Sequence, residues 1–309
     1  MGRLCIGFDT SNYTTSAAVF DGEAAVNCGK LLTVPEGTLG LRQSDAVFQH
    51  VKRLPLMVEE LRGVIAARKV EAVGASTQPR EVEGSYMPCF LVGEGQGRSL
   101  AHVLGVPFFA CSHQQGHIAA AAWSSGREDL MDIPHLAWHL SGGTTELLYV
   151  EPLGYNVKAK VIGGTTDISA GQLIDRTGQL LGLPFPSGKH IDALSKEAVL
   201  TETFKVKCPG LEFSLSGVQN KVQQFHEKHG IPAETAAYAL RCVAKAVYLA
   251  TENALKMYPG CRVVFSGGVA SNSMLRQIML PLNPIFSEPQ YSTDNAMGVA
   301  VLAHRLSQE

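Results

Sequence analysis

A short internal repeat constrains the fold of this chain more than any other feature of its sequence. The segment Asp9–Thr15 (DTSNYTT) aligns with His139–Thr145 (HLSGGTT) at a constant spacing of 130 residues. Apolar residues precede and follow each copy, which predicts a strand, a tight polar turn and a second strand. The predicted strands are Leu4–Phe8 and Ala17–Phe20 in the first copy, and Leu136–Trp138 and Leu147–Val150 in the second. A chance match is the alternative, because Ser and Thr are common in turns, but the shared context favours a duplicated β-hairpin.

Long helical patterns accompany the two hairpins. Asp45–Ala67 carries regularly spaced apolar residues, although Pro55 is expected to kink or divide that helix. Ala236–Met257 is rich in helix formers, and a last helix is expected to start near Asp294. Hairpins followed by helices, twice over, predict an α/β fold of two related lobes facing a cleft.

The length of 309 residues also favours two lobes, since it exceeds the usual size of one domain. The segment Trp123–Pro134 is the expected boundary. We therefore predict an N-terminal lobe over 1–130 and a C-terminal lobe over 131–309, with the last helix, 294–309, packing back on the first lobe.

Composition excludes several classes of protein. The formal net charge is -2, so the chain lacks the basic character of a protein that captures nucleic acid unaided. Its 7 cysteines are scattered and form no CxxC pair, which argues against a disulfide framework or a zinc ribbon. The sequence shows no leader and no apolar segment long enough to span a membrane. A cytoplasmic protein is expected.

The sharpest local signal is the motif His113-Gln-Gln-Gly-His117. Two histidines at i and i+4 on a helix share one face, so both imidazoles can reach one ion. Zinc proteases place a glutamate directly after the first histidine to activate water, whereas this chain has Gln114. A metalloprotease is therefore disfavoured. Two ordinary, hydrogen-bonded histidines are the alternative to a metal site.

A metal site needs a third ligand, and Asp294 in the segment Ser-Thr-Asp-Asn is the best candidate. Its alternative role is to cap the last helix. Two imidazoles and one carboxylate would suit Fe(II) or Zn(II).

Turns rich in Gly, Ser and Thr form the second signal. They lie at 9–15, 139–145 and 266–272, and glycine there lets backbone N–H groups approach anionic oxygens. A strand at Val263–Phe265 leads into Gly267 and Gly268, and a helix should begin near Ser271 or Asn272. Three such turns would suit a nucleotide, although each alone is most often just a turn. The chain has neither a Walker A motif nor the GxGxxG spacing of a dinucleotide fold.

A third signal is an acid on a predicted helix followed by a loop of Pro and Gly. Asp175 lies in Gly171–Arg176, and the loop ends in Pro186-Ser-Gly188. This arrangement would suit a ligand-binding edge, and an ordinary helix end is an equal alternative.

Taken together, these motifs resemble the tRNA threonylcarbamoyl-transferase family, formerly labelled a glycoprotease. The matching segments are HQQGH (113–117), LSGGTT (140–145), AGQLID (170–175), LLGLPFPSG (180–188), FSLSG (213–217), GGVASN (267–272) and STDNAMG (292–298). The resemblance runs in order along nearly the whole chain.

The resemblance implies a fold of the actin, Hsp70 and sugar-kinase type and a set of site residues. It implies one divalent metal, Fe or Zn, held by His113, His117 and Asp294. It implies a pocket for threonylcarbamoyl-adenylate, or an ATP- or AMP-type nucleotide. The pocket residues would be His139, Leu140, Ser141, Gly142, Gly143, Asp175, Gly188, Gly267, Gly268 and Asn272. Asp9, at the start of the first turn, is the candidate catalytic residue.

The reaction implied is transfer of the threonylcarbamoyl group to the adenosine next to a tRNA anticodon. The metal would act as a Lewis acid while the turns hold the nucleotide. Partner subunits, in a homo- or hetero-dimer, would help to bind tRNA, in agreement with the low net charge.

Several positions depart from the family pattern. The family's first turn, ETSCDET, is DTSNYTT here and lacks its two inner acids, and Thr144 replaces a usual histidine. A divergent paralogue is indicated, so the alternative is a catalytically weakened nucleotide- and metal-binding subunit that regulates an active relative. Hydrogenase-maturation proteins share the fold and the HxxxH motif, but would normally carry additional modules.

Overall fold

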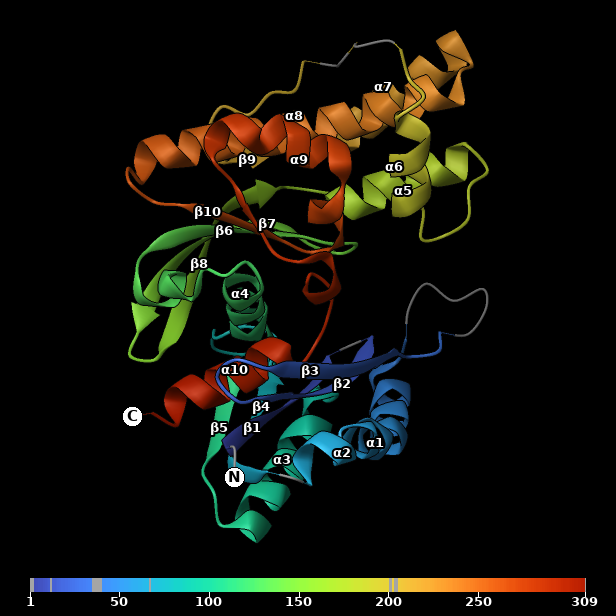
Figure 1. Ribbon diagram of the computed structural model, residues 1–309. Coiled ribbons are helices and arrows are strands. Elements are labelled where there is room, and N and C mark those ends of the chain that lie inside the picture. Colours follow the sequence, from blue (N-terminus) through green and yellow to red (C-terminus); the bar gives the residue numbers. More distant parts are fainter. Residues whose placement is uncertain are drawn as a thin grey trace. The chain divides into compact units, whose positions relative to one another are not determined.

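The computed structural model describes residues 3–11, 13–34, 41–66, 68–199, 202 and 205–308 (Figure 1). Contacts divide the chain into two compact units. Unit 1 comprises Met1–Ile133, Glu151–Ala159 and Asp294–Glu309. Unit 2 comprises Pro134–Val150 and Lys160–Thr293. No helix within the described ranges is both long enough and apolar enough to cross a membrane.

Unit 1 is built on a five-stranded sheet with the order β3-β2-β1-β4-β5. The strands are β1 (Arg3–Ser11), β2 (Thr14–Phe20), β3 (Ala25–Leu31), β4 (Lys69–Gln78) and β5 (Phe108–Ser112). The first three are antiparallel, whereas β4 and β5 run parallel to β1. The helices are α1 (Gln43–Glu60), α2 (Arg62–Ile65), α3 (Phe90–Leu104), α4 (His113–Ser124) and α10 (Met297–Leu306), with a 3-10 turn at Glu128–Asp132.

Unit 2 contains a six-stranded sheet with the order β11-β10-β6-β7-β8-β9. The strands are β6 (His135–Leu140), β7 (Thr145–Leu153), β8 (Asn156–Thr165), β9 (Glu212–Phe213), β10 (Val263–Ser266) and β11 (Ile285–Phe286). The helices are α5 (Ala170–Leu180), α6 (Gly188–Ser195), α7 (Ser216–His229), α8 (Pro232–Met257) and α9 (Ser273–Met279). Short 3-10 turns cover Gly268–Ser271, Leu280–Leu282 and Pro289–Tyr291.

The predicted repeat is confirmed as two hairpins with the same register. Thr10 pairs with Thr15 in the first hairpin, and Leu140 pairs with Thr145 in the second, again 130 residues apart. Strand order repeats as well. In each sheet the first hairpin strand, β1 or β6, has its antiparallel partner on one side and a parallel strand, β4 or β10, on the other. A further parallel strand, β5 or β11, follows in each sheet. One residue of the first turn, Asn12, lies outside the described residues.

Successive side chains of β1 point to opposite faces of the sheet and so contact different helices. Leu4, Ile6 and Phe8 point into a core with α1 and α3, in which Leu54 is fully buried. The opposite face of β1 carries Gly7, where an added Cβ would lie 2.4 Å from the Ala300 backbone nitrogen of α10. Helix α10 therefore packs directly on the sheet, on the side away from α1 and α3 (Figure 1).

The structure decides two points that the sequence left open. Helix α1 passes through Pro55 without dividing and ends at Glu60. Pro55 and Val51 are both on the exposed side, where water can satisfy the carbonyl that the proline leaves unpaired. The last helix begins at Met297, three residues after Asp294, and Asp294 does not cap it. The Met297 N–H donates instead to Asn295 Oδ1, at 2.9 Å.

Candidate metal and nucleotide sites

Helix α4 begins directly at the first histidine because the preceding residue caps it. Ser112 Oγ accepts from the Gln115 backbone N–H at 3.2 Å, and Gln115 Oε1 accepts from the Ser112 N–H at 2.8 Å. This capping box places His113 in the first turn of the helix. His117 follows one turn later, so both imidazoles share a face, as the spacing predicts.

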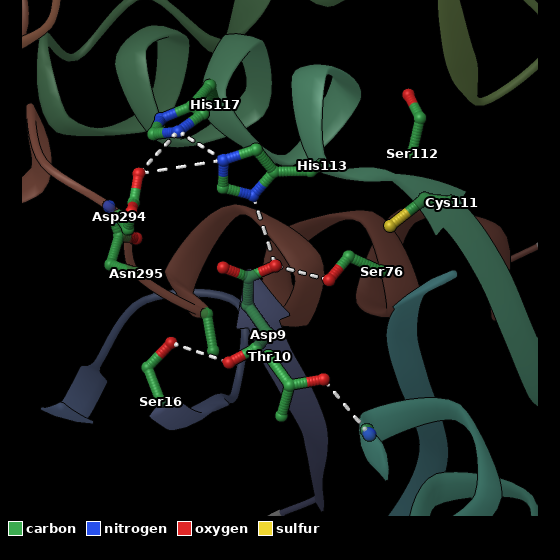
Figure 2. A network of polar contacts seen from close by, with 12 residues as sticks. Asp9, Thr10, Ser16, Ser76, Cys111, Ser112, His113, His117, Asp294 and Asn295 are labelled. Atoms are coloured by element: carbon green, nitrogen blue, oxygen red, sulfur yellow. Dashed lines mark hydrogen bonds and ion pairs between the residues drawn. The ribbon is translucent and has the colours of Figure 1, made fainter. Parts of the chain in front are cut away.

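The two histidines and Asp294 form one cluster within unit 1 (Figure 2). Asp294 Oδ1 lies 3.5 Å from His113 Nε2 and 3.4 Å from His117 Nε2. The two Nε2 atoms are 3.0 Å apart. His117 is 5% exposed, whereas the side chains of His113 and Asp294 are 18% and 32% exposed, so the cluster is approachable from one side.

Close packing of two helices brings Asp294 to the histidines. An added Cβ on Gly298 of α10 would lie 1.7 Å from the Gly116 carbonyl oxygen of α4. Only glycine at this crossing lets the two helices approach so closely. Asp294 lies four residues before Gly298, just ahead of α10, and Gly116 lies between the two histidines, so the crossing brings the carboxylate close to them.

The charges in the cluster are strongly coupled. Burial lowers the pKa of an imidazole, yet the carboxylates of Asp9 and Asp294 outweigh it and raise the pKa of His113 to about 10. Burial would raise the pKa of Asp294, but hydrogen bonds and attraction from both histidines hold it well below its usual value. The site therefore holds negative charge that attracts a cation, whether a proton or a metal ion.

The donor set fits a divalent metal. The three ligand atoms lie within 4.8 Å of one another, and two nitrogens with one carboxylate oxygen suit iron or zinc. His113 Nδ1 lies 3.1 Å from Asp9 Oδ1, the carboxylate–histidine arrangement found behind many metal ligands. Asp9 is fully buried, and its Oδ2 has no hydrogen-bond partner among the described residues.

In unit 2 the SGG turn packs against the start of α5. Ser169 Oγ donates to the Gly142 carbonyl at 2.6 Å, and a Cβ on Gly171 would lie 2.4 Å from Gly142 Cα. Leu140 meets Gly267, where φ is +92° and a Cβ would lie 2.2 Å from the Leu140 carbonyl oxygen. The structure thus brings the 139–145 turn and Gly267-Gly268 together at the ends of the parallel strands β6 and β10.

Some of these glycines are in close contact with neighbouring backbone, and others face free space. Gly142, Gly143, Gly188 and Gly268 are exposed, and an added Cβ on any of them would meet no atom within 4 Å. A ligand therefore has room to approach the backbone of these turns, as anion binding requires.

Asp175, Gly188 and Asn272 are connected through α6. Asp175 Oδ1 accepts from the Ser187 N–H at 2.8 Å, immediately before Gly188. Asn272 caps α9 by accepting from Leu275 N–H at 3.0 Å, as the sequence predicted for Ser271 or Asn272. Its Nδ2 donates to Asp192 Oδ1 at 2.7 Å, one turn after Gly188 on the same helix.

Sequence reasoning missed Asp192 and Ser76. Asp192 holds the amide of Asn272 and also accepts from Ser273 N–H and Oγ, at 3.0 and 2.8 Å. Ser76 donates to Asp9. The i+4 spacing from Gly188 could have indicated Asp192, whereas Ser76 lies in a run of small residues with no motif.

The chain matches the TsaD family profile, described as tRNA N6-adenosine threonylcarbamoyltransferase, over residues 37–301. The tRNA N6-adenosine threonylcarbamoyltransferase of Carboxydothermus hydrogenoformans is 30% identical over 319 residues, covering 98% of this chain and 92% of the relative. A protein of the same name from Thermus thermophilus is 33% identical over 318 residues, covering 98% of this chain and 93% of the relative.

Solved structures with the same fold are more distant in sequence. HypF of T. kodakarensis has a TM-score of 0.63 at 14% identity, over 98% of this chain and 47% of that one. The ROK hexokinase of Thermus thermophilus has a TM-score of 0.53 at 14% identity, over 99% and 100%. These similarities confirm the predicted actin-like ATPase fold.

Proposed function

This chain belongs to the tRNA N6-adenosine threonylcarbamoyltransferase family, and we propose that it transfers a threonylcarbamoyl group from an adenylate to a tRNA adenosine next to the anticodon. In this reaction the N6 amine attacks the carbamoyl carbonyl carbon. A carbon–nitrogen bond forms, the carbon–oxygen bond to the phosphate breaks, and AMP leaves with that oxygen while the amine loses a proton. The observation that carries the proposal is the cluster of His113, His117 and Asp294.

The three clustered side chains would hold one divalent ion, iron or zinc. When bound, such an ion acts as a Lewis acid that polarises a carbonyl oxygen and stabilises the negative charge that develops on it. The chain itself contributes fixed ligand directions, since the capping box orients α4 and the Gly116–Gly298 contact fixes the approach of Asp294.

The turns of unit 2 would bind the adenylate. The exposed backbone at Gly142, Gly143 and Gly268 offers N–H donors to phosphate oxygens. Asp175 offers a carboxylate that can recognise ribose hydroxyls, while Asn272, buried and bonded to Leu275 and Asp192, holds the start of α9 beside α6. Holding the nucleotide in one orientation lowers the entropic cost of the transfer.

The proposal includes tRNA as acceptor and the cytoplasm as the place of action. A net charge of -2 gives weak long-range attraction to RNA, so we expect a partner subunit to contribute basic surface.

The test is direct transfer in solution. Purified protein, with any partner subunits it requires, is mixed with threonylcarbamoyl-adenylate and unmodified tRNA, and modified adenosine is measured by mass spectrometry. We expect wild type to form the product and His113→Ala to be at least about 100-fold slower, a loss of about 2.7 kcal/mol of transition-state stabilisation. The control is His102→Ala on α3, an exposed histidine outside the cluster, which should retain activity.

A second function is favoured by the first turn, where the family's two inner acids are replaced by Tyr13 and Thr14. It is a regulatory subunit that binds nucleotide and metal without transferring the group. Binding of the adenylate by wild type, with no product in the presence of partner subunits, would support this function and contradict the transferase.

A further inference from the structure

We propose that Asp9 and Ser76 act as a positioning pair that fixes the imidazole of His113 as a metal ligand. Neither residue belongs to the ligand set, yet both would control metal affinity. The inference rests on the metal site proposed above and adds two residues that orient one of its ligands.

The sheet of unit 1 places both side chains beside α4. Asp9 follows Phe8 on β1, Ser76 follows Ala75 on β4, and Phe8 and Ala75 are register partners in the parallel pair. Side chains alternate between the two faces of a strand, so Asp9 shares a face with Gly7 and Ser76 shares a face with Gly74. This is the face on which α10 packs, because an added Cβ on either glycine would contact residues of α10. Both side chains therefore lie near His113, at the carboxyl ends of these strands (Figure 2).

The hydrogen bond from His113 to Asp9 determines where the imidazole proton lies. An ionised carboxylate can only accept, so the 3.1 Å contact requires the proton on His113 Nδ1. The other nitrogen, Nε2, faces His117 and Asp294, so it is the one that would give its lone pair to a metal once a metal displaces the proton there. This is the tautomer that a metal ligand needs, and it is fixed by the partner of the opposite nitrogen.

Ser76 orients the carboxylate that performs this function. Its hydroxyl donates to Asp9 Oδ1, the same oxygen that accepts from His113. Ser16 Oγ also donates to the Asp9 backbone carbonyl, at 3.3 Å. The carboxylate is thus held by Ser76 and His113, while Ser16 holds the backbone of the same residue.

The charge of Asp9 is also unusual for a residue with a purely structural role. It is fully buried, and among the described residues its ion-pair partner is His113, with no Lys or Arg contributing. A buried carboxylate is costly unless it is paired and hydrogen-bonded, and here one carboxylate oxygen has no donor among the described residues. A metal ion bound through His113 would balance this charge, so the structure links the buried carboxylate to the cation.

The experiment is a titration of the metal-free protein with Co(II), whose visible absorption bands report both affinity and ligand geometry. Asp9→Asn keeps the volume and removes the charge. We expect its Co(II) affinity to fall by about 10- to 100-fold, the range typical of a lost outer partner, with a change in the absorption bands. Ser76→Ala, which keeps the carboxylate, should weaken binding by a smaller factor.

A matched control separates positioning from general destabilisation. Thr10, the next residue on β1, is also fully buried, donates to the Cys89 carbonyl at 2.9 Å and does not touch His113. Thr10→Val should lower thermal stability while leaving Co(II) affinity and absorption unchanged. In an Asp9→Asn background, Ser76→Ala should add less than about twofold, because its effect passes through the carboxylate.

The outcomes are distinguishable. Equal affinity and identical spectra for wild type and Asp9→Asn would overturn the positioning pair while leaving the metal site and the transferase intact. Failure of wild type to bind Co(II) would overturn the metal site itself, together with this inference.

Discussion

His50 shows how a single buried residue ties the first hairpin to α1. Its side chain is fully buried, and its Nδ1 lies 2.8 Å from Thr15 Oγ1 on β2. Removal from water lowers the pKa of His50 from its usual 6.5 to about 4, although the charge of Asp9 acts in the opposite direction. The folded protein therefore keeps this imidazole neutral at pH values where the unfolded chain would protonate it.

This residue should make stability depend on pH. The unfolded chain binds the proton below pH 6.5 and the folded chain only below about 4, so the free energy of unfolding falls as the pH decreases through that window. The full contribution would be about 3 kcal/mol. Melting temperatures between pH 7 and pH 4.5 should decline less steeply for His50→Gln than for wild type, and parallel curves would contradict the assignment.

At the scale of elements, the crossing of α4 and α10 brings together the side chains of the candidate metal site. The histidine spacing is local and could be read from the sequence because i and i+4 always share a helix face. The approach of Asp294 is not local, since it depends on Gly116 and Gly298 meeting across 182 residues of sequence. No pattern within either segment predicts that contact, although Asp294 was predicted as the third ligand from its residue type and the family resemblance implied the same three residues.

Gly298→Ala tests this crossing. The added methyl group would overlap the Gly116 carbonyl and force α10 away from α4, which should reduce the free energy of unfolding by about 1–3 kcal/mol and weaken metal binding at the same time. Gly95→Ala is the control, because Gly95 is an exposed helical glycine of α3 with free space around it. That substitution should be neutral or stabilising by up to about 1 kcal/mol. An unchanged metal affinity in Gly298→Ala would contradict the proposed role of the crossing.

At the scale of the whole molecule, the duplicated hairpin is the part of the fold that could be predicted from the sequence. Each hairpin is formed by neighbouring residues, so apolar alternation around a polar turn was enough to predict both, and their shared register confirms the repeat. The roles of Ser76 and Asp192 could not be predicted in the same way. Ser76 depends on the pairing of β4 with β1, and Asp192 on the packing of α6 beside Asn272.

The repeat also separates two tasks between the units. Unit 1 carries the histidine and aspartate cluster at the ends of β1 and β5, while unit 2 carries the glycine turns at the ends of β6 and β10. The same strand arrangement thus supports a candidate metal-binding cluster in one copy and candidate nucleotide-binding turns in the other.

The most direct test of the account is X-ray diffraction from crystals of the metal-loaded protein at the iron and zinc absorption edges. The account predicts one anomalous peak per chain, about 2.0–2.2 Å from His113 Nε2, His117 Nε2 and Asp294 Oδ1, and its loss in Asp294→Ala. A fully loaded protein whose anomalous peak lies away from these three side chains would contradict it.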